Sequence, residues 1–570
     1  MCEAMEPKDF DQLLALVGEY GKYQKRLLYL FIYPMGMILP FFIMIFFFQV
    51  AVPSHWCHVE GRERLGFSIE QWKNLTIPER MTEEGVMGYS KCEAYDVSWI
   101  VNDVLNNTSD SDQEDLSAKA REEFQRKLLS HPPGILNCDR WEFDRSVYVE
   151  TVVSQFSWVC KRDHFPAGLL TIQSAGHILG SFIFGPVSDY FGRRVTFFAT
   201  TTIQWIFGLA LIFSPDFPSF ATLTFVGSWV FPAAYQNAYV LVVEQVGPDY
   251  RGLVNGAVNC IWTVGLCLLA LIAWLLKGHW IHLALIGNVP VLLYYGYYWL
   301  LKESPRWQLT RSKVSEVRDT MIYVGKVNGK EIDPDEMERL IKIVKDREQD
   351  PIIPQYWSLL KRPVMRTRTI VTTYTYMAVL ALYYGLHLDV GTLGRDPYLS
   401  TAILAAIELP SYLISYFCME RYGRRWVCSA LLLIAAIGTG LVPAFSFGSW
   451  CRILWAVVGK FGASGGFLVV YQQEIEVFPT VLRNTGLAFV SIVSTTICIG
   501  VPYLIYLGTY HVSIPYVTFA FVAGVGAVLS TFLPETLHKD LPETLHDAET
   551  FATDQKYWSL NLHPSKSTSI

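Results

Sequence analysis

Long apolar runs separated by short polar segments dominate the chain. Six runs begin before residue 302 and six more begin after residue 368. A helix needs about 20 mainly apolar residues to cross the hydrocarbon core of a bilayer, so the pattern predicts an all-α membrane protein with twelve transmembrane helices. The runs begin near Leu27, Phe165, Val195, Phe220, Val254 and Ile281, and then near Ile370, Tyr398, Val427, Cys451, Thr485 and Ile514.

The spacing of the runs predicts the domain organisation. We expect one six-helix bundle over residues 27–301 and a second over residues 369–533. A cytoplasmic loop over 302–368, dense in Lys, Arg, Glu and Asp, joins them. Residues 1–26 and 534–570 form the N-terminal and C-terminal cytoplasmic segments. Residues 1–23 are acidic and polar and do not resemble a cleaved signal peptide, so the first helix is expected to direct membrane insertion.

The composition agrees with a membrane protein and excludes one class of partner. Of the 570 residues, 51% are hydrophobic and 17% are charged, whereas soluble proteins carry about a quarter charged residues. The formal net charge is −6, without a block of basic residues. Nucleic-acid binding relies on such a block. We therefore expect the chain to lie in the lipid bilayer and not to bind nucleic acid.

Basic residues gather in alternate loops, which predicts the orientation. Cytoplasmic loops of membrane proteins are enriched in Lys and Arg. The opposite loops are poor in them, since residues 214–220 hold none and Lys277 stands alone. We expect a multi-pass plasma-membrane protein with both termini in the cytoplasm. The residues behind this expectation are Lys22, Lys25, Arg26, Arg193, Arg194, Arg251, Arg421, Arg424, Arg425 and Arg483.

The segment 53–164 between the first two runs is then extracellular. Its four cysteines predict two disulfides in an oxidising compartment, with three pairings left open. It also holds three Asn-x-Ser/Thr patterns that accept N-linked glycans. The cysteines are Cys57, Cys92, Cys138 and Cys160, and the acceptor residues are Asn74, Asn106 and Asn107.

An acid–Gly–Arg–Arg motif appears once in each half, at matching positions. It runs from Gly185 to Arg194 after the second run and from Glu420 to Arg425 after the eighth. A twofold repeat of six helices is typical of transporters whose halves rock about a central site. Anchoring by basic residues alone would explain the arginines but not the acid and glycines. The expected gate residues are Gly185, Asp189, Gly192, Arg193, Arg194, Glu244, Arg251, Glu303, Arg306, Glu420, Arg424, Arg425, Glu476 and Arg483.

These motifs resemble the major facilitator superfamily, and within it the organic cation, organic anion and carnitine transporter branch. Glu303-Ser-Pro-Arg-Trp307 and the segment from Glu476 to Gly486 carry the resemblance further. In the seventh run, the segment from Tyr383 to Asp389 is similar to carnitine-type transporters and fits sugar porters less well. The resemblance implies the major facilitator fold, with twelve helices in two pseudo-symmetric six-helix bundles and alternating access.

Glu408 is the principal candidate for solute binding. It lies midway along the eighth run and matches a glutamate of the cation and carnitine members. Charged side chains inside membrane helices are functional candidates by default, and a buried carboxylate attracts an amine or a quaternary ammonium. The alternative is a structural role beside a polar group on a neighbouring helix. Lys460 either receives a solute carboxylate or pairs with an acid such as Glu474.

Aromatic and polar residues complete the expected site. Tyrosine rings attract an ammonium group, and residues four apart on a helix share a face. His177 is either a proton-sensitive switch or a hydrogen-bonded structural residue. The expected substrate-binding residues are Tyr235, Gln236, Tyr239, Asn259, Trp262, Tyr383, Tyr384, Glu408, Lys460, Tyr471 and Thr495.

Thr495 is the main departure from the branch. Cation members carry an aspartate at the corresponding position, and anion or carnitine members carry an arginine. With neither charge present, Glu408 and Lys460 favour a cationic or zwitterionic solute, such as carnitine, a betaine, a β-amino acid or an amine conjugate. An organic anion transporter of the same fold and a non-transporting, receptor-like member are the alternatives.

Other functional classes fit the sequence less well. A channel would need a selectivity filter or an arginine-rich voltage helix, and an enzyme would need a motif such as His-Glu-x-x-His or Gly-x-Ser-x-Gly. The sequence has no such channel feature and no His-Glu-x-x-His, and its one Gly-x-Ser-x-Gly match, Gly462–Gly466, lies inside the tenth apolar run and not at the strand-to-helix turn that the motif requires. We therefore expect a transporter of a small organic solute without a metal or another cofactor. Whether sodium or a proton is co-transported stays open.

Overall fold

The computed structural model describes most of the chain. It covers residues 10–81, 87–107, 113–299, 301–347, 357–394, 396–446, 448–479, 482–537, 542, 545–551 and 555. Most of the predicted C-terminal segment lies outside the described residues. Within the described residues, helices make up nearly all of the regular structure, and strands occur only in the segment between the first and second spans.

The N-terminal half contains six helical spans. They are α2–η1–α3 (Lys22–Arg26, Leu27–Ile32, Tyr33–Gln49), α9 (Phe165–Phe191), α10–η3 (Arg193–Ala210, Leu211–Phe213), α11–α12 (Phe217–Ser228, Phe231–Val243), α13 (Pro248–Leu275) and α14–η4 (Trp280–Asn288, Val289–Tyr298).

The C-terminal half repeats this arrangement. Its spans are α19 (Pro363–Leu388), α21–α22 (Pro397–Ala406, Glu408–Tyr422), α23–η5 (Arg424–Leu441, Val442–Ala444), α24 (Trp450–Val477), α25–α26–η7 (Arg483–Cys498, Val501–Tyr506, Leu507–Thr509) and α27 (Ser513–Ser530). A four-residue helix, α20 (Val390–Leu393), precedes α21.

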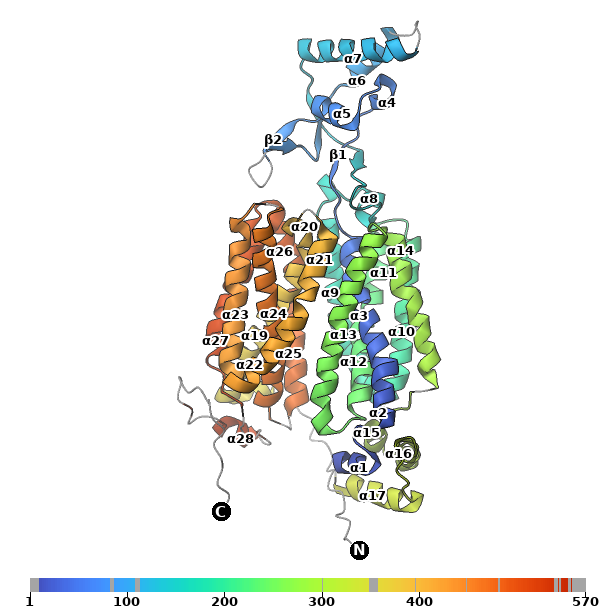
Figure 1. Cartoon of the computed structure of the whole chain (residues 1–570), viewed down its shortest axis with the longest axis vertical. Coiled ribbons are helices and arrows are strands. Elements are labelled where there is room, and N and C mark those ends of the chain that lie inside the picture. The colour runs from blue at the N-terminus through green and yellow to red at the C-terminus, as the bar shows by residue number, and fades with distance from the viewer. Residues whose placement is uncertain are drawn as a thin grey trace.

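Length and hydropathy alone mark nine of these spans, counted over the described residues, as able to cross a membrane. The other three are α11–α12, α14–η4 and α19. The first two are broken into shorter helices, and the third begins with a polar segment that carries Arg366 and Arg368. All twelve spans run side by side in two bundles, which Figure 1 shows with the C-terminal half in orange and red beside the N-terminal half in green and blue.

Short helices cover one end of the bundles, which we call the base. Below the N-terminal half lie α1 (Phe10–Val17), α15 (Pro305–Thr310), α16 (Val314–Asn328) and α17 (Pro334–Arg347). Below the C-terminal half lie α18 (Ser358–Lys361) and α28 (Leu545–Thr550). The apolar faces of α1, α16 and α17 bury Leu13, Val17, Met321 and Ile341 in a core continuous with the bundle, so these helices are packed parts of the half above them.

A separate domain, which we call the disulfide domain, stands at the opposite end between α3 and α9 (Figure 1). Its helices are α4 (Arg62–Leu65), α5 (Ile69–Thr76), α6 (Ser98–Asn107), α7 (Gln113–Ser130), α8 (Val152–Phe156) and η2 (Cys160–Arg162). Its strands form three antiparallel pairs, β1–β6 (His55–Cys57, Trp141–Phe143), β2–β3 (Glu79–Met81, Met87–Tyr89) and β4–β5 (Glu93–Tyr95, Ile135–Asn137).

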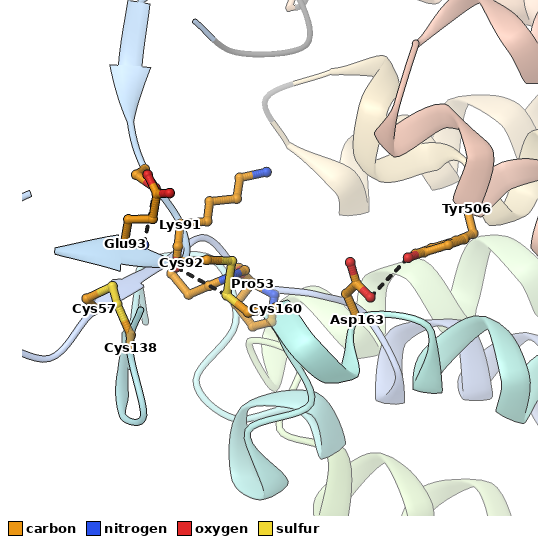
Figure 2. The surroundings of a disulfide bond; sticks show 11 residues. Pro53, Cys57, Lys91, Cys92, Glu93, Cys138, Cys160, Asp163 and Tyr506 are labelled. Carbon is orange, nitrogen blue, oxygen red and sulfur yellow. Dashed lines mark hydrogen bonds between the residues drawn. A yellow bond between two sulfur atoms is a disulfide. The ribbon is translucent and has the colours of Figure 1, made fainter. Parts of the chain in front are cut away.

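Two disulfides hold this domain, and they settle the pairing that the sequence left open. Cys57 is bonded to Cys138 and Cys92 to Cys160, as Figure 2 shows. Because three-residue strands are too short to be stable alone, the disulfides and a small apolar core supply the stability. Of the predicted glycan acceptors, Asn74 and Asn106 are exposed, and the side chain of Asn107 lies outside the described residues.

Candidate functional site

Glu408 and Lys460 form a buried ion pair in the C-terminal half. The Lys460 Nζ atom lies 2.9 Å from Glu408 Oε1, and neither side chain is exposed. Glu408 is positioned by a break between α21 and α22, because Pro410 has no N–H to donate to the carbonyl of Ala406. The sequence had offered Glu474 as a partner for Lys460, but the structure gives it Glu408.

Further polar groups surround Glu408. His387 Nε2 lies 3.4 Å from Oε1, and the hydroxyl groups of Thr263 and Tyr412 donate to Oε2 at 3.2 and 3.5 Å. Thr263 lies on α13 of the N-terminal half, so its bond crosses the interface between the halves. His387 and Thr263 were not among the predicted site residues, although Thr263 follows Trp262 and His387 lies one helical turn after Tyr383.

The predicted aromatic residues meet at the same interface. The Lys460 ammonium lies 3.2 Å from the centre of the Tyr383 ring, a cation–π contact. Trp262 of the N-terminal half donates its indole N–H to the Tyr383 hydroxyl at 3.0 Å. Tyr235 and Tyr239 stack with ring centres 6.2 Å apart. The structure therefore brings together groups from α12, α13, α19, α22 and α24.

Three other predicted residues lie apart from these contacts. Asn259 donates its side-chain N–H to the Asn255 carbonyl within α13 at 2.9 Å. Gln236 is exposed, unlike its neighbours on α12. Thr495 is half-buried on α25, next to Ser494, which donates to the Thr373 carbonyl at 3.0 Å. None of these contacts reaches the Glu408–Lys460 pair.

His177 lies in the N-terminal half, beside a small cavity lined by apolar and polar side chains. The cavity has a volume of about 50 Å³ and lies among α3, α9, α10, α11 and α14. The His177 ring centre is 5.4 Å from that of Phe231. The polar side chains lining the cavity are Gln49, Gln173, His177, Gln204, Thr224, Ser228 and Asn288.

The predicted gate residues of the N-terminal half form one network at the base. Gly192 has a positive φ of 101°, and a Cβ there would collide with the Glu303 carboxylate. Glu303 accepts the backbone N–H groups of Arg193 and Arg194 at 3.0 and 3.2 Å, at the start of α10, where a negative charge is favoured. Burial raises the pKa of the Glu303 carboxyl, and these N–H groups act in the opposite direction.

The Arg193 side chain completes this network. Its guanidinium lies 3.0 Å from Asp189 and 3.6 Å from Glu244, and it donates to the Ser188 carbonyl. The Asp189 side chain is nevertheless 72% exposed. Gly185, one turn earlier, has open space at its Cβ position. Both observations place the motif on a face of the N-terminal half that is open at the base.

The C-terminal half contains the matching network. Gly423 has a φ of 92°, and a Cβ there would collide with Glu535. Glu535 accepts the backbone N–H groups of Arg424 and Arg425 at 2.8 and 3.2 Å. The Arg424 guanidinium lies 2.9 Å from Glu420 and 3.2 Å from Glu476. Each half therefore holds its arginines with its own acids.

Glu535 and Asp11 are the gate-region residues that sequence reasoning missed. Glu535 takes in the C-terminal half the place that Glu303 takes in the N-terminal half. The sequence feature that could have revealed it is an acid next to a proline just after the last span, similar to the Glu303-Ser-Pro motif. Asp11 of α1 accepts from both Arg251 and Arg306 at 2.6 Å. No sequence pattern points to this bond. Arg483, the remaining predicted gate residue, is the first residue of α25.

The halves are joined near the disulfide domain. Tyr506 of α26 donates its hydroxyl to Asp163 at 3.0 Å, a bond drawn in Figure 2 beside the Cys92–Cys160 disulfide. Tyr398 of α21 donates to the Val147 carbonyl at 3.0 Å and stacks on Phe48 of α3. These contacts close the interface at this end, opposite the base.

The family follows from a match over most of the two bundles. Residues 150–546 match the sequence family described as "Sugar (and other) transporter". The chain belongs to this family. It is also 30% identical to the carcinine transporter of Drosophila melanogaster, over 97% of this chain and 81% of that protein. These matches confirm the predicted superfamily and its organic cation and carnitine branch.

Other relatives agree with this assignment. The chain is 29% identical to the beta-alanine transporter of Drosophila melanogaster, over 95% of this chain and 89% of that protein. It is 28% identical to the human organic cation/carnitine transporter 2, over 94% and 93%. The xylose transporter XylE from E. coli, in an inward-open conformation, matches in fold with a TM-score of 0.54, 17% identity, and coverage of 71% of this chain and 92% of that one.

Proposed function

We propose that this chain carries small organic cations or zwitterions across the plasma membrane by alternating access. The observation that carries the proposal is the cluster at the interface between the halves, where tyrosines and a tryptophan from both bundles meet around buried carboxylates of the C-terminal half. Aromatic faces and carboxylates recognise ammonium groups. Relatives named for carcinine, beta-alanine and carnitine transport all have solutes with an amine or ammonium group.

The two networks at the base support the gating part of the proposal. In each half, a glycine turn and a helix-end carboxylate fix the paired arginines, which makes each half rigid at the base. Contacts between the halves near the disulfide domain close the opposite end. A transporter needs a rigid half that rocks against its partner around the central site, and these networks and contacts meet that requirement.

The proposed orientation places the disulfide domain outside the cell and the base in the cytoplasm. Disulfides persist in oxidising compartments, and the exposed Asn74 lies in the same domain. The base carries Arg193, Arg251 and Arg424, in agreement with the preference of basic residues for the cytoplasmic side.

Uptake into proteoliposomes tests the function. Labelled carnitine, β-alanine and carcinine are compared with the anion p-aminohippurate, while the membrane potential and the sodium gradient are varied separately. We expect saturable uptake of at least one cation or zwitterion and faster exchange when the same solute is preloaded. Uptake of the anion alone would support the anion alternative. Uptake no greater than in empty liposomes would contradict transport altogether.

A further inference from the structure

One buried acid at the interface has no part in the Glu408 cluster. Glu474 lies on α24, 14 residues beyond Lys460 and therefore about 21 Å closer to the base along the helix. It is only 2% exposed, and its Oε1 atom has no hydrogen-bond partner among the described residues. Nor does a charged side chain in the described part of the chain offset its charge. A buried carboxylate normally has such a partner.

Glu474 lies on the side of α24 that faces the site. Lys460, Phe467, Tyr471 and Glu474 are spaced seven, four and three residues apart, which places them on one helix face. The contacts of the first two show where that face points. Lys460 lies over the Tyr383 ring of α19, and the Phe467 ring centre is 6.1 Å from that of Tyr383.

Two tyrosines of the C-terminal half lie near Glu474. Tyr471 precedes Glu474 by three residues on the same face of α24, and Tyr376 of α19 lies close enough for the carboxylate to act on its hydroxyl group. The Phe467 ring centre is 5.6 Å from that of Tyr376, so Tyr376 packs against the same face of α24 that carries Glu474. Tyr471 in turn interacts with the stacked pair Tyr235 and Tyr239 of the N-terminal half. An acid and several aromatic rings are the parts of an ammonium-binding site.

Glu408 is poorly suited to that role in this structure. Its charge is already matched by Lys460 at 2.9 Å, so a solute ammonium would have to displace an internal lysine. Glu474 offers a negative charge without a competitor, on the same face of α24 and nearer the open base.

We infer that Glu474, with Tyr471 and Tyr376 beside it, binds the cationic nitrogen of the transported solute. This inference rests on the proposed transport of cations or zwitterions. It assigns the recognition of an ammonium group to Glu474 and leaves the Glu408–Lys460 pair as a positioning element of the interface. Primary ammonium and quaternary ammonium solutes both fit, because a carboxylate attracts either.

The test compares Glu474→Gln with the parent protein in proteoliposomes, using labelled carnitine and labelled β-alanine. Loss of the charged partner should raise KM about tenfold or more for each solute that the parent carries, which corresponds to about 1.4 kcal/mol. At equal protein density, the maximal rate of Glu474→Gln should stay within about threefold of the parent's rate. This corresponds to a smaller free-energy change than the expected change in KM. Glu336→Gln, on the exposed surface of α17, is the matched control and should leave KM unchanged.

Three further variants keep the inference open to failure if Glu474→Gln does not fold. Glu474→Asp retains the charge but shortens the side chain, and should raise KM by a smaller factor. Tyr471→Phe retains the ring face and should leave KM nearly unchanged, whereas Tyr471→Ala should raise it. An unchanged KM in both Glu474→Gln and Glu474→Asp would overturn the inference. A parent protein that takes up neither solute would instead overturn the proposed function.

Discussion

Glu408 and Glu474 are the same chemical group in two different surroundings. Both lie on helices of the C-terminal half, and they are 0% and 2% exposed. Glu408 has an ammonium at 2.9 Å and three further polar neighbours. Glu474 has tyrosines nearby and an oxygen without a partner among the described residues.

This difference shows that an acid inside a membrane helix cannot be given a role from its position alone. Where the charge is matched by the protein, removing either partner disturbs the fold, because the remaining charge is stranded in the interior. Where the charge is unmatched, an incoming cation can take the partner's place. The predictions below separate these two cases, from the largest expected effect to the smallest.

The largest effect is expected for Lys460→Met. This change leaves Glu408 buried without its counter-charge, which should lower the free energy of unfolding by about 3–5 kcal/mol. Thermal unfolding of the purified protein in detergent measures the loss. The double variant Glu408→Gln/Lys460→Met removes both charges and should recover most of it. A single variant as stable as the parent would mean that Glu408 does not depend on Lys460.

The sequence predicted the spans better than it predicted the pairing of their charges. Apolar runs are local features, and each of the twelve starts lies within about seven residues of a helix boundary in the structure. The breaks near Pro232 and Pro410 follow from prolines that remove a backbone donor. The Glu408–Lys460 pair depends instead on how α22 and α24 are rotated against each other, which no local pattern encodes.

The same limit applies at the base. The Gly–Arg–Arg motif and Glu303 were visible because each contains an unusual spacing of charged residues and glycines. Glu535 fills the equivalent place in the C-terminal half, but its one signal, the neighbouring Pro534, is weak in a polar segment that holds several other acids. Asp11 meets Arg251 and Arg306 only because α1 packs on α16. Tertiary packing, not sequence period, selects these partners.

The second prediction concerns the hydrogen bond that joins Glu408 to the other half. Thr263→Val keeps the shape of the side chain but removes its donor to Glu408, a bond to a charged group worth about 1.5–3 kcal/mol. Because the bond crosses the interface, its loss should disfavour the conformation that is open at the base. Maleimide labelling of a cysteine at Gly256, where the Cβ position is open, should become slower. Thr263→Ser retains the hydroxyl and should label like the parent, and equal slowing in both variants would contradict the role of the bond.

The third prediction gives Glu474 the internal partner that it lacks. Tyr471→Lys places an ammonium three residues before Glu474 on the same helix face, reproducing the situation of Glu408. The internal lysine should compete with the solute and raise KM for carnitine or β-alanine about tenfold, or about 1.4 kcal/mol. Tyr471→Met removes the ring without adding charge and serves as the control. If both variants raise KM equally, the ring and not the carboxylate accounts for the effect.

The smallest effect is expected at His387, and its size decides which group matches the charge of Glu408. His387 Nε2 lies 3.4 Å from Glu408 Oε1, farther than the 2.9 Å of Lys460 Nζ, so the histidine supplements an ion pair that is already complete. His387→Leu should therefore lower the free energy of unfolding by only about 0.5–1.5 kcal/mol, the net contribution of one ordinary hydrogen bond. His387→Gln retains a donor and should fall between His387→Leu and the parent in the same thermal unfolding measurement. A loss from His387→Leu as large as that from Lys460→Met would mean that a charged imidazole is the main partner of Glu408. In that case the lysine would be free to receive a solute carboxylate, and the contrast between the two glutamates would rest on histidine protonation instead of a permanent ion pair.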